Sequence, residues 1–126
     1  MKIVDTDVII WYMRGNEKAA VILENMTNIM LSAVTYMELV QGMRNKAELS
    51  SLETTLNTWN ATTIPINEDI SNQASMLVKQ YFHSHSVSLA DALIAATALQ
   101  YQLPLLTAND KHYKMIADLN LEVFRP

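Results

Sequence analysis

The chain begins with the sequence MKIVDTDVII at residues 1–10, where an acid interrupts a run of apolar side chains. Ile3 and Val4 are β-branched, which predicts a short buried strand. Asp5 then lies at the carboxyl end of that strand, the edge at which open α/β sheets bind their ligands. A carboxylate at this edge must be solvated, capped or paired with a cation. The stretch therefore predicts a divalent metal site in which acids from later in the chain join Asp5.

The composition predicts a single globular domain over residues 1–126, because 50% of the residues are hydrophobic and only 17% are charged. No apolar run approaches the roughly 20 residues that a membrane-spanning helix needs. The start also lacks the basic and apolar regions of a signal peptide. We therefore expect a cytoplasmic protein that does not contact a membrane.

Cysteine content and net charge limit the chemistry. The chain has no cysteine, which excludes disulfides and thiolate metal sites. Its formal net charge of −4 argues against a protein that binds nucleic acid through a general excess of basic residues. An enzyme that meets phosphates through a bound metal is still compatible with this charge, because the metal reverses the local sign.

Short apolar segments alternate with helical patterns along the chain. Strands are expected at residues 3–4, 29–31, 61–66 and 105–106, with a further edge strand at 121–124. Helices are expected at residues 8–13, 17–26, 33–43, 45–58, 89–101 and 109–117, and from a cap at Asn67 or Asp69 to about residue 82. Residues 83–86 form a polar connection. This alternation predicts an α/β fold with three layers, α/β/α, around a mainly parallel sheet of four to five strands.

Three acids, Asp5, Glu38 and Asp91, each stand in an apolar setting and have no Lys or Arg beside them in the sequence. Such a carboxylate set with few cationic partners suits a hard cation such as Mg²⁺ or Mn²⁺. Each acid also has a plain structural interpretation. Asp5 is a candidate helix cap, Glu38 a candidate surface acid, and Ser88-x-x-Asp91 resembles a capping box. Thr6 or Asp7 is expected to cap the first helix.

Four segments occur in a fixed order: IVDTD at residues 3–7, SAVTYMEL at 32–39, DALIAATA at 91–98 and LTAN at 106–109. Together they resemble PIN-domain ribonucleases, most closely the VapC toxins of bacterial and archaeal toxin–antitoxin pairs, over nearly the whole chain. The resemblance implies a PIN-like fold, an acidic pocket that holds Mg²⁺ or Mn²⁺, and cleavage of RNA phosphodiester bonds. By match of motif, Asp5, Glu38 and Asp91 are the catalytic metal-site acids.

The fourth acidic position of the family falls on an amide in this chain. Many family members carry an acid where this sequence has Asn109, with Asp110 beside it. We expect Asn109 or Asp110 to hold a second metal or a water. Thr6 and Thr107 follow strand ends and are expected to support the site. Asp7 lies nearby, at a position where the family often has Asn.

The resemblance also implies partners, namely an RNA substrate, a second copy of the chain in a homodimer, and a cognate antitoxin. The antitoxin is expected to place a basic side chain among the acids and so to compete with the metal. Flanking phosphates of the RNA are candidates for contact with four basic side chains: Arg14, Arg44, Lys46 and Lys111.

Two other functions compete with the nuclease. Asp5-x-Asp7 after a strand resembles the nucleophile motif of phosphotransfer and phosphohydrolase domains, although the Lys and the later paired acids of such enzymes are missing from the pattern. A PIN-like binding module without catalytic activity is the second alternative, and Asn109 is the residue that favours it.

Overall fold

The computed structural model describes residues 1–85 and 87–126, which form five strands and six α-helices. The strands are β1 (Lys2–Val4), β2 (Ile29–Ser32), β3 (Thr62–Ile64), β4 (Leu105–Thr107) and β5 (Leu121–Val123). The helices are α1 (Thr6–Met13), α2 (Glu17–Glu24), α3 (Ala33–Gln41), α4 (Lys46–Thr58), α5 (Glu68–Tyr81) and α6 (Leu89–Tyr101). All strands are parallel, in the order β3-β2-β1-β4-β5. The predicted α/β fold is confirmed, and the sheet is entirely parallel.

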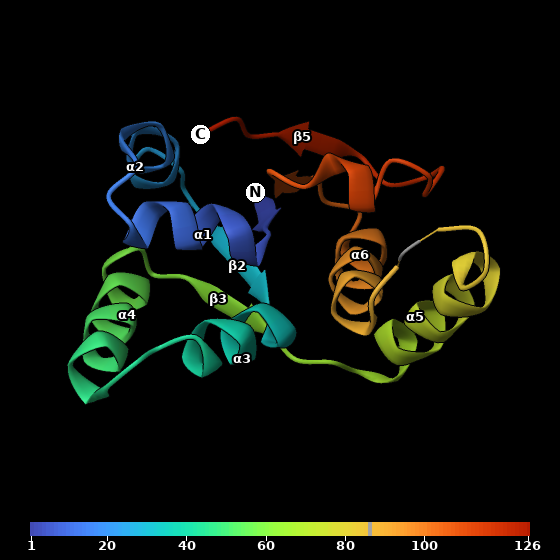
Figure 1. The fold of residues 1–126 in the computed structure, drawn as a ribbon, viewed down its shortest axis with the longest axis horizontal. Coiled ribbons are helices and arrows are strands. Elements are labelled where there is room, and N and C mark those ends of the chain that lie inside the picture. Colours follow the sequence, from blue (N-terminus) through green and yellow to red (C-terminus); the bar gives the residue numbers. More distant parts are fainter. Residues whose placement is uncertain (86) are drawn as a thin grey trace.

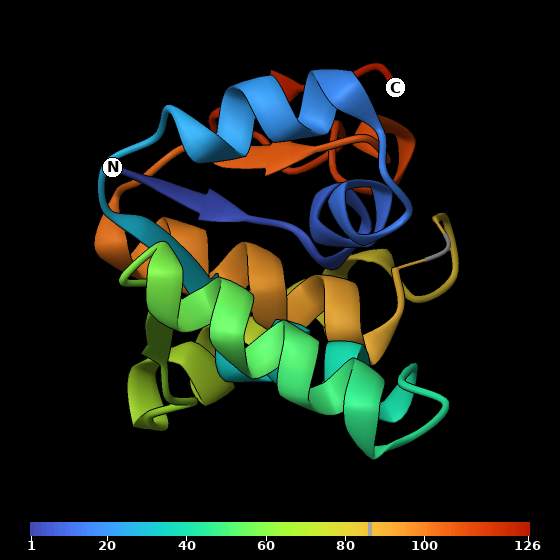
Figure 2. The same ribbon diagram turned by 90° about the vertical axis from the view of Figure 1, so that its left-hand side faces the viewer.

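Side chains alternate across the central strands and so create two cores. Ile3 and Leu105 pack with α5 and α6 on one face, whereas Val4 and Leu106 pack with α1, α2 and α4 on the other. Figure 1 shows these two groups of helices on opposite sides of the strands, with α3 between them. Figure 2 views the layer that contains α2 and α4 from outside. Because both faces are covered, the central strands β1, β2 and β4 contain runs of apolar residues.

Local capping fixes where the helices begin. The side chain of Ser88 accepts a hydrogen bond from the Asp91 N–H and caps α6, as its sequence predicts. The prediction that Thr6 or Asp7 caps α1 is wrong. Asp5 is the cap: it has an extended backbone, and its side chain accepts from the Thr6 N–H. In the described part of the chain, no helix combines the length and the apolar character that crossing a bilayer requires.

The helix expected at residues 109–117 does not form. Only a 3₁₀ turn, Asp110–His112, is present, and the chain continues in further tight turns. Tyr113, Ile116 and Leu119 all pack into the core beside α6, and their spacing of three residues suits turns with three residues per repeat. The other predicted helix and strand ends differ from the observed ones by about two residues. The polar connection expected at residues 83–86 ends at Ser86, which lies outside the described residues.

The strand β5 allows a direct check of the core at the end of the chain. Phe124 follows β5, is 2% exposed and packs against the core around α1 and α2, whereas the neighbouring Val123 is 47% exposed. Phe124→Ala is expected to lower the free energy of unfolding by about 3–5 kcal/mol, because it leaves a cavity. Val123→Ala is the matched control, with an expected loss below about 1 kcal/mol. Urea denaturation of both variants measures this, and equal losses would contradict the packing described here.

Candidate active site

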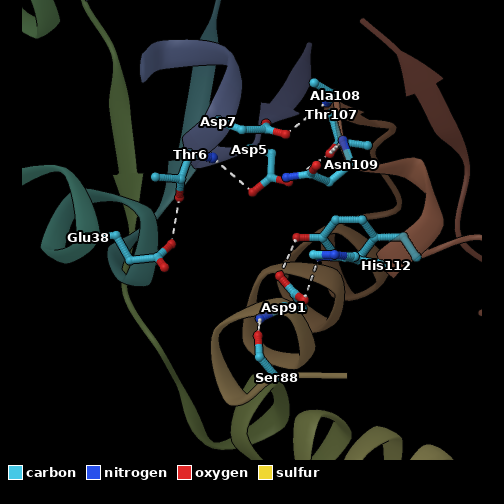
Figure 3. Close-up of polar contacts among 11 residues, drawn as sticks. Asp5, Thr6, Asp7, Glu38, Ser88, Asp91, Thr107, Ala108, Asn109 and His112 are labelled. Atoms are coloured by element: carbon cyan, nitrogen blue, oxygen red, sulfur yellow. Dashed lines mark hydrogen bonds and ion pairs between the residues drawn. The ribbon is translucent and has the colours of Figure 1, made fainter. Parts of the chain in front are cut away.

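A pocket of about 370 Å³ opens beyond the carboxyl ends of β1 and β4, where the loops that follow these strands meet the first turn of α6. Four of its lining residues carry carboxylates, which come from the β1–α1 junction, α1, α3 and α6 (Figure 3). Among the described residues that line the pocket, none is Lys or Arg. The lining consists of Asp5, Thr6, Asp7, Ile10, Glu38, Ser88, Asp91, Asn109 and His112.

Asp5 lies at the centre of the pocket and is only 5% exposed. One carboxylate oxygen accepts from the Thr6 N–H at 2.8 Å, and the other accepts from the Thr107 hydroxyl at 2.8 Å. Burial raises the pKa of the Asp5 carboxyl to about 7, and the neighbouring charge of Asp7 adds to this effect. Asp5 is therefore the cap of α1 and also lines the pocket, so the cap does not exclude a role in the site.

Glu38 reaches the pocket from α3. Its side chain is exposed, and its Oε1 atom accepts a hydrogen bond of 2.7 Å from the Thr6 hydroxyl. The same hydroxyl lies 3.0 Å from the hydroxyl of the buried Thr35. The contact with Thr6 brings Glu38 beside the start of α1, which the sequence alone did not reveal.

Asp91 lies in the first turn of α6, and its carboxylate is held from the far end of the chain. Its Oδ1 atom accepts from the Tyr113 hydroxyl at 3.2 Å, and its Oδ2 atom lies 3.2 Å from Nδ1 of His112. Tyr113 is fully buried; burial, followed by the charges of Asp5 and Asp91, raises the pKa of its hydroxyl, so the hydroxyl stays a donor. The bond to the cap, Ser88, comes from the backbone N–H of Asp91, so capping leaves the carboxylate free to contact these two groups.

Asp7 also lines the pocket, and its two oxygens differ. Oδ2 accepts from the Ala108 N–H at 3.1 Å, which ties α1 to the loop after β4. Oδ1 is buried and has no hydrogen-bond partner among the described residues. Burial raises the pKa of the Asp7 carboxyl above its ordinary value.

The two candidates for the fourth position are separated by the structure. Asn109 lines the pocket, and its N–H donates to the Thr107 hydroxyl at 2.9 Å. Asp110 points elsewhere, since its carboxylate accepts a 2.9 Å bond from Arg125 that lowers its pKa. Of the pair, the structure brings Asn109 and not Asp110 into the described pocket lining.

Sequence reasoning missed two supporting residues, His112 and Tyr113. The spacing of the three histidines in the sequence gives no sign of a metal ligand. His112 is half-exposed, yet it lines the pocket and touches Asp91. The contact between Tyr113 and Asp91 joins residues 22 apart on separate elements, so no local pattern announces it.

The described acids of the pocket are not close enough together to form a complete metal-binding site in this conformation. Within residues 1–85 and 87–126, no three His, Cys, Asp or Glu side chains are grouped closely enough to hold a metal ion as they stand. Glu38 and Asp91 instead bond to protein hydroxyls and to His112. The pocket is thus an acidic basin, in which each carboxylate accepts hydrogen bonds from its own set of donor groups.

A parallel α/β/α domain with an acidic pocket at the carboxyl edge of its sheet is the class that the geometry defines. The chain belongs to the PIN domain family, which it matches over residues 2–119. It is 36% identical to Ribonuclease VapC19 of Mycobacterium tuberculosis, over 94% of this chain and 97% of that protein. The family resemblance inferred from the four motifs is confirmed.

Solved structures give the same result. A toxin–antitoxin complex from Klebsiella pneumoniae contains a chain that superposes with a TM-score of 0.80 at 28% identity, covering 94% of this chain and 95% of its own. FitAcB from Neisseria gonorrhoeae superposes with a TM-score of 0.77 at 25% identity, covering 96% of each chain. In each comparison the similarity therefore extends over nearly the full length of this chain and of the chain it is compared with.

Proposed function

We propose that this protein is a metal-dependent endoribonuclease toxin that hydrolyses RNA phosphodiester bonds and is neutralised by a cognate antitoxin. One observation carries the proposal: four carboxylates line one pocket at the sheet edge, and no Lys or Arg is among its described lining residues. The ribonuclease name of the relative in Mycobacterium tuberculosis supports the choice of RNA as substrate.

The donor set fits a hard divalent cation. Oxygen ligands from carboxylates suit Mg²⁺ and Mn²⁺. Burial, followed by the charge of Asp7, raises the pKa of Asp5, and burial is also the main cause that raises the pKa of Asp7. Asp5, Glu38 and Asp91 are the residues that would hold the cation, with Asn109 beside them. Glu38 is exposed on α3, and its long side chain can exchange the Thr6 hydroxyl for a cation by rotation.

A bound Mg²⁺ or Mn²⁺ would supply a Lewis acid that activates a water and neutralises the charge of the scissile phosphate. The protein's part is to orient the acids before the substrate arrives. The Thr6 N–H and the Thr107 hydroxyl fix the plane of the Asp5 carboxylate. Tyr113 and His112 do the same for Asp91. A carboxylate on this rim is also suited to accept the proton of the attacking water.

A second hollow adjoins the acidic pocket and supports a path for the RNA strand. It lies between α1, α3 and α4, and it shares Ile10 and Glu38 with the pocket. Arg14 and Arg44 line it and are both exposed, so they are placed to meet phosphates that flank the cleaved bond. Arg44 is already paired with Glu48, which makes Arg14 the better donor.

Cleavage of a panel of tRNAs and structured RNAs tests the proposed function. The purified protein is assayed with Mg²⁺, with Mn²⁺ and with EDTA. We expect endonucleolytic products with either metal and none with EDTA. Cleavage that persists unchanged in EDTA after dialysis would refute the metal dependence. If Mn²⁺ does not bind in calorimetry and no RNA is cut, the inactive PIN-like binding module becomes the better function.

Tyr113→Phe tests the support of Asp91. The substitution keeps the buried ring and removes only the hydroxyl that donates to Asp91 Oδ1. We expect a roughly 10-fold loss of Mn²⁺ affinity, the usual effect of removing a group that orients a metal ligand, with little change in melting temperature. Tyr101→Phe is the matched control, because Tyr101 is exposed at the end of α6. Equal Mn²⁺ affinity in Tyr113→Phe and the unmodified protein would remove Tyr113 from the site.

The antitoxin is proposed to act at the acids themselves. A basic side chain placed among Asp5, Glu38 and Asp91 would pair with them and compete with the cation. Titration of Mn²⁺ in the presence of the cognate antitoxin is expected to give weaker binding, and unchanged affinity would contradict direct competition. The homodimer is likewise a proposal, which light scattering on the isolated protein tests directly.

A phosphotransfer function that uses Asp5 as nucleophile is less well supported. Both oxygens of Asp5 already accept hydrogen bonds, and the described pocket lining lacks the Lys that such enzymes use. Trapping of a phosphorylated Asp5 would nevertheless favour it.

A further inference from the structure

One atom in the pocket has no structural explanation. Among the described residues, Asp7 Oδ1 is a buried side-chain oxygen without a hydrogen-bond partner. Buried polar atoms are nearly always paired, because an unpaired one costs about 1–3 kcal/mol. Protonation does not repair the defect: a carboxylate oxygen there needs a donor, and a protonated one needs an acceptor. A ligand of positive charge satisfies the atom in its ionised form.

The charge of Asp7 is not required for the hydrogen bond that its carboxylate accepts from Ala108. Oδ2 accepts from the Ala108 N–H, and the carbonyl oxygen of an asparagine side chain would accept the same bond. The negative charge instead adds repulsion, since Asp7 lies near Asp5 and Asp91 in a pocket without a described Lys or Arg. A fold selected for stability alone has no reason to keep an acid at this position.

The position of Asp7 in the pocket suits its negative charge to binding a cation. The bond to Ala108 brings Asp7 against the loop whose next residue, Asn109, lines the pocket with a neutral amide. An acid from the first turn of α1 therefore stands beside the amide side chain in the described pocket lining. The two side chains come from opposite ends of the chain and meet at the same corner of the basin (Figure 3).

We infer that Asp7 is a carboxylate ligand of the divalent cation in this pocket and brings the negative charge that Asn109 does not supply. Asp7 has this role only if the chain holds a cation at all, as proposed above. The site then contains four acids: Asp5, Asp7, Glu38 and Asp91.

Asp7→Asn tests the assignment, with Mn²⁺ binding measured by calorimetry and by electron paramagnetic resonance. We expect Mn²⁺ affinity to fall roughly 10-fold or more. In EDTA the variant should melt at the same temperature as the unmodified protein or higher, because a buried, repelled charge has been removed. Asp69→Asn is the matched control: Asp69 is also the second residue of its helix, but it is exposed, and both measurements should stay unchanged.

A second variant restores the charge from the other side. Asp7→Asn combined with Asn109→Asp returns the acid to the same corner, and we expect it to recover most of the lost Mn²⁺ affinity. A purely structural role for Asp7 predicts the opposite pattern, with a lower melting temperature in EDTA and no recovery in the double variant.

The outcomes separate the two proposals. If the unmodified protein binds Mn²⁺ and Asp7→Asn binds it equally well, the role of Asp7 is refuted and the proposed nuclease stands. If the unmodified protein binds no Mn²⁺ and cuts no RNA, both are refuted. A fall in the EDTA melting temperature of Asp7→Asn also overturns the inference, because it assigns Asp7 to the fold.

Discussion

Asp5→Asn is expected to reduce RNA cleavage by about 10³-fold or more and to abolish measurable Mn²⁺ binding. The amide keeps an oxygen that accepts from the Thr6 N–H, so the cap of α1 survives. It loses the negative charge at the oxygen facing Thr107, which is the charge a cation needs. Cleavage is followed with saturating Mn²⁺ on the RNA that the unmodified protein cuts best.

Asp110→Asn is the control for this experiment. Asp110 lies only one residue beyond Asn109 but points to Arg125, outside the described pocket lining. We expect it to keep full cleavage and Mn²⁺ affinity. Full activity of Asp5→Asn in a preparation free of other nucleases would show that the assigned site is wrong, and loss of activity in Asp110→Asn would return Asp110 to the site.

The metal-free protein is expected to be more stable at pH 5 than at pH 8. The folded pKa of Asp5 is about 7 against an ordinary value of 3.8, so between these values the folded state binds a proton that the unfolded state has lost. Stability is therefore highest below the ordinary pKa and is lost as the pH rises through about 7. The difference between pH 5 and pH 8 is on the order of 2–3 kcal/mol. The raised pKa of Asp7 acts in the same direction.

Urea denaturation in EDTA at the two pH values measures this difference. The groups that face Asp5 are the acid Asp7 and the donors Thr107 and Tyr113, and no described Lys or Arg lines the pocket to offset them. Asp5→Asn should flatten the profile. Saturating Mn²⁺ should reverse it, because a cation binds the ionised acids. Greater stability at pH 8 in EDTA would contradict the burial of an unpaired acid at this position.

Features with local causes were predictable from the sequence. The helix α6 begins and ends where expected, because Ser88 caps it and the chain breaks before Pro104. Asp5 was placed at a sheet edge because two β-branched residues precede it. The pocket's other details depend on contacts between distant segments. No short stretch of sequence indicates the order of the strands. The same is true of the hydrogen bonds from Thr107 to Asp5 and from Tyr113 to Asp91.

The helix predicted at residues 109–117 is absent for a physical reason. The sequence pattern predicts an α-helix here, yet the core beside α6 accepts Tyr113, Ile116 and Leu119 at intervals of three. Packing decided the backbone, and the resulting turn carries His112 and Tyr113 to Asp91. An α-helix over the same residues would present them at a different angular spacing, since it has 3.6 residues per turn.

The bond between Thr107 and Asp5 has a consequence for how the protein is made. It joins residues 102 positions apart, and β4 pairs directly with β1 in the middle of the sheet. Asp5 is synthesised long before Thr107, Asn109 and Tyr113, so a chain still emerging from the ribosome carries Asp5 without the later residues that support the pocket. The basin therefore cannot assemble on a partial chain. For a protein that we propose cuts RNA, unfinished copies that lack this later segment also lack the assembled pocket.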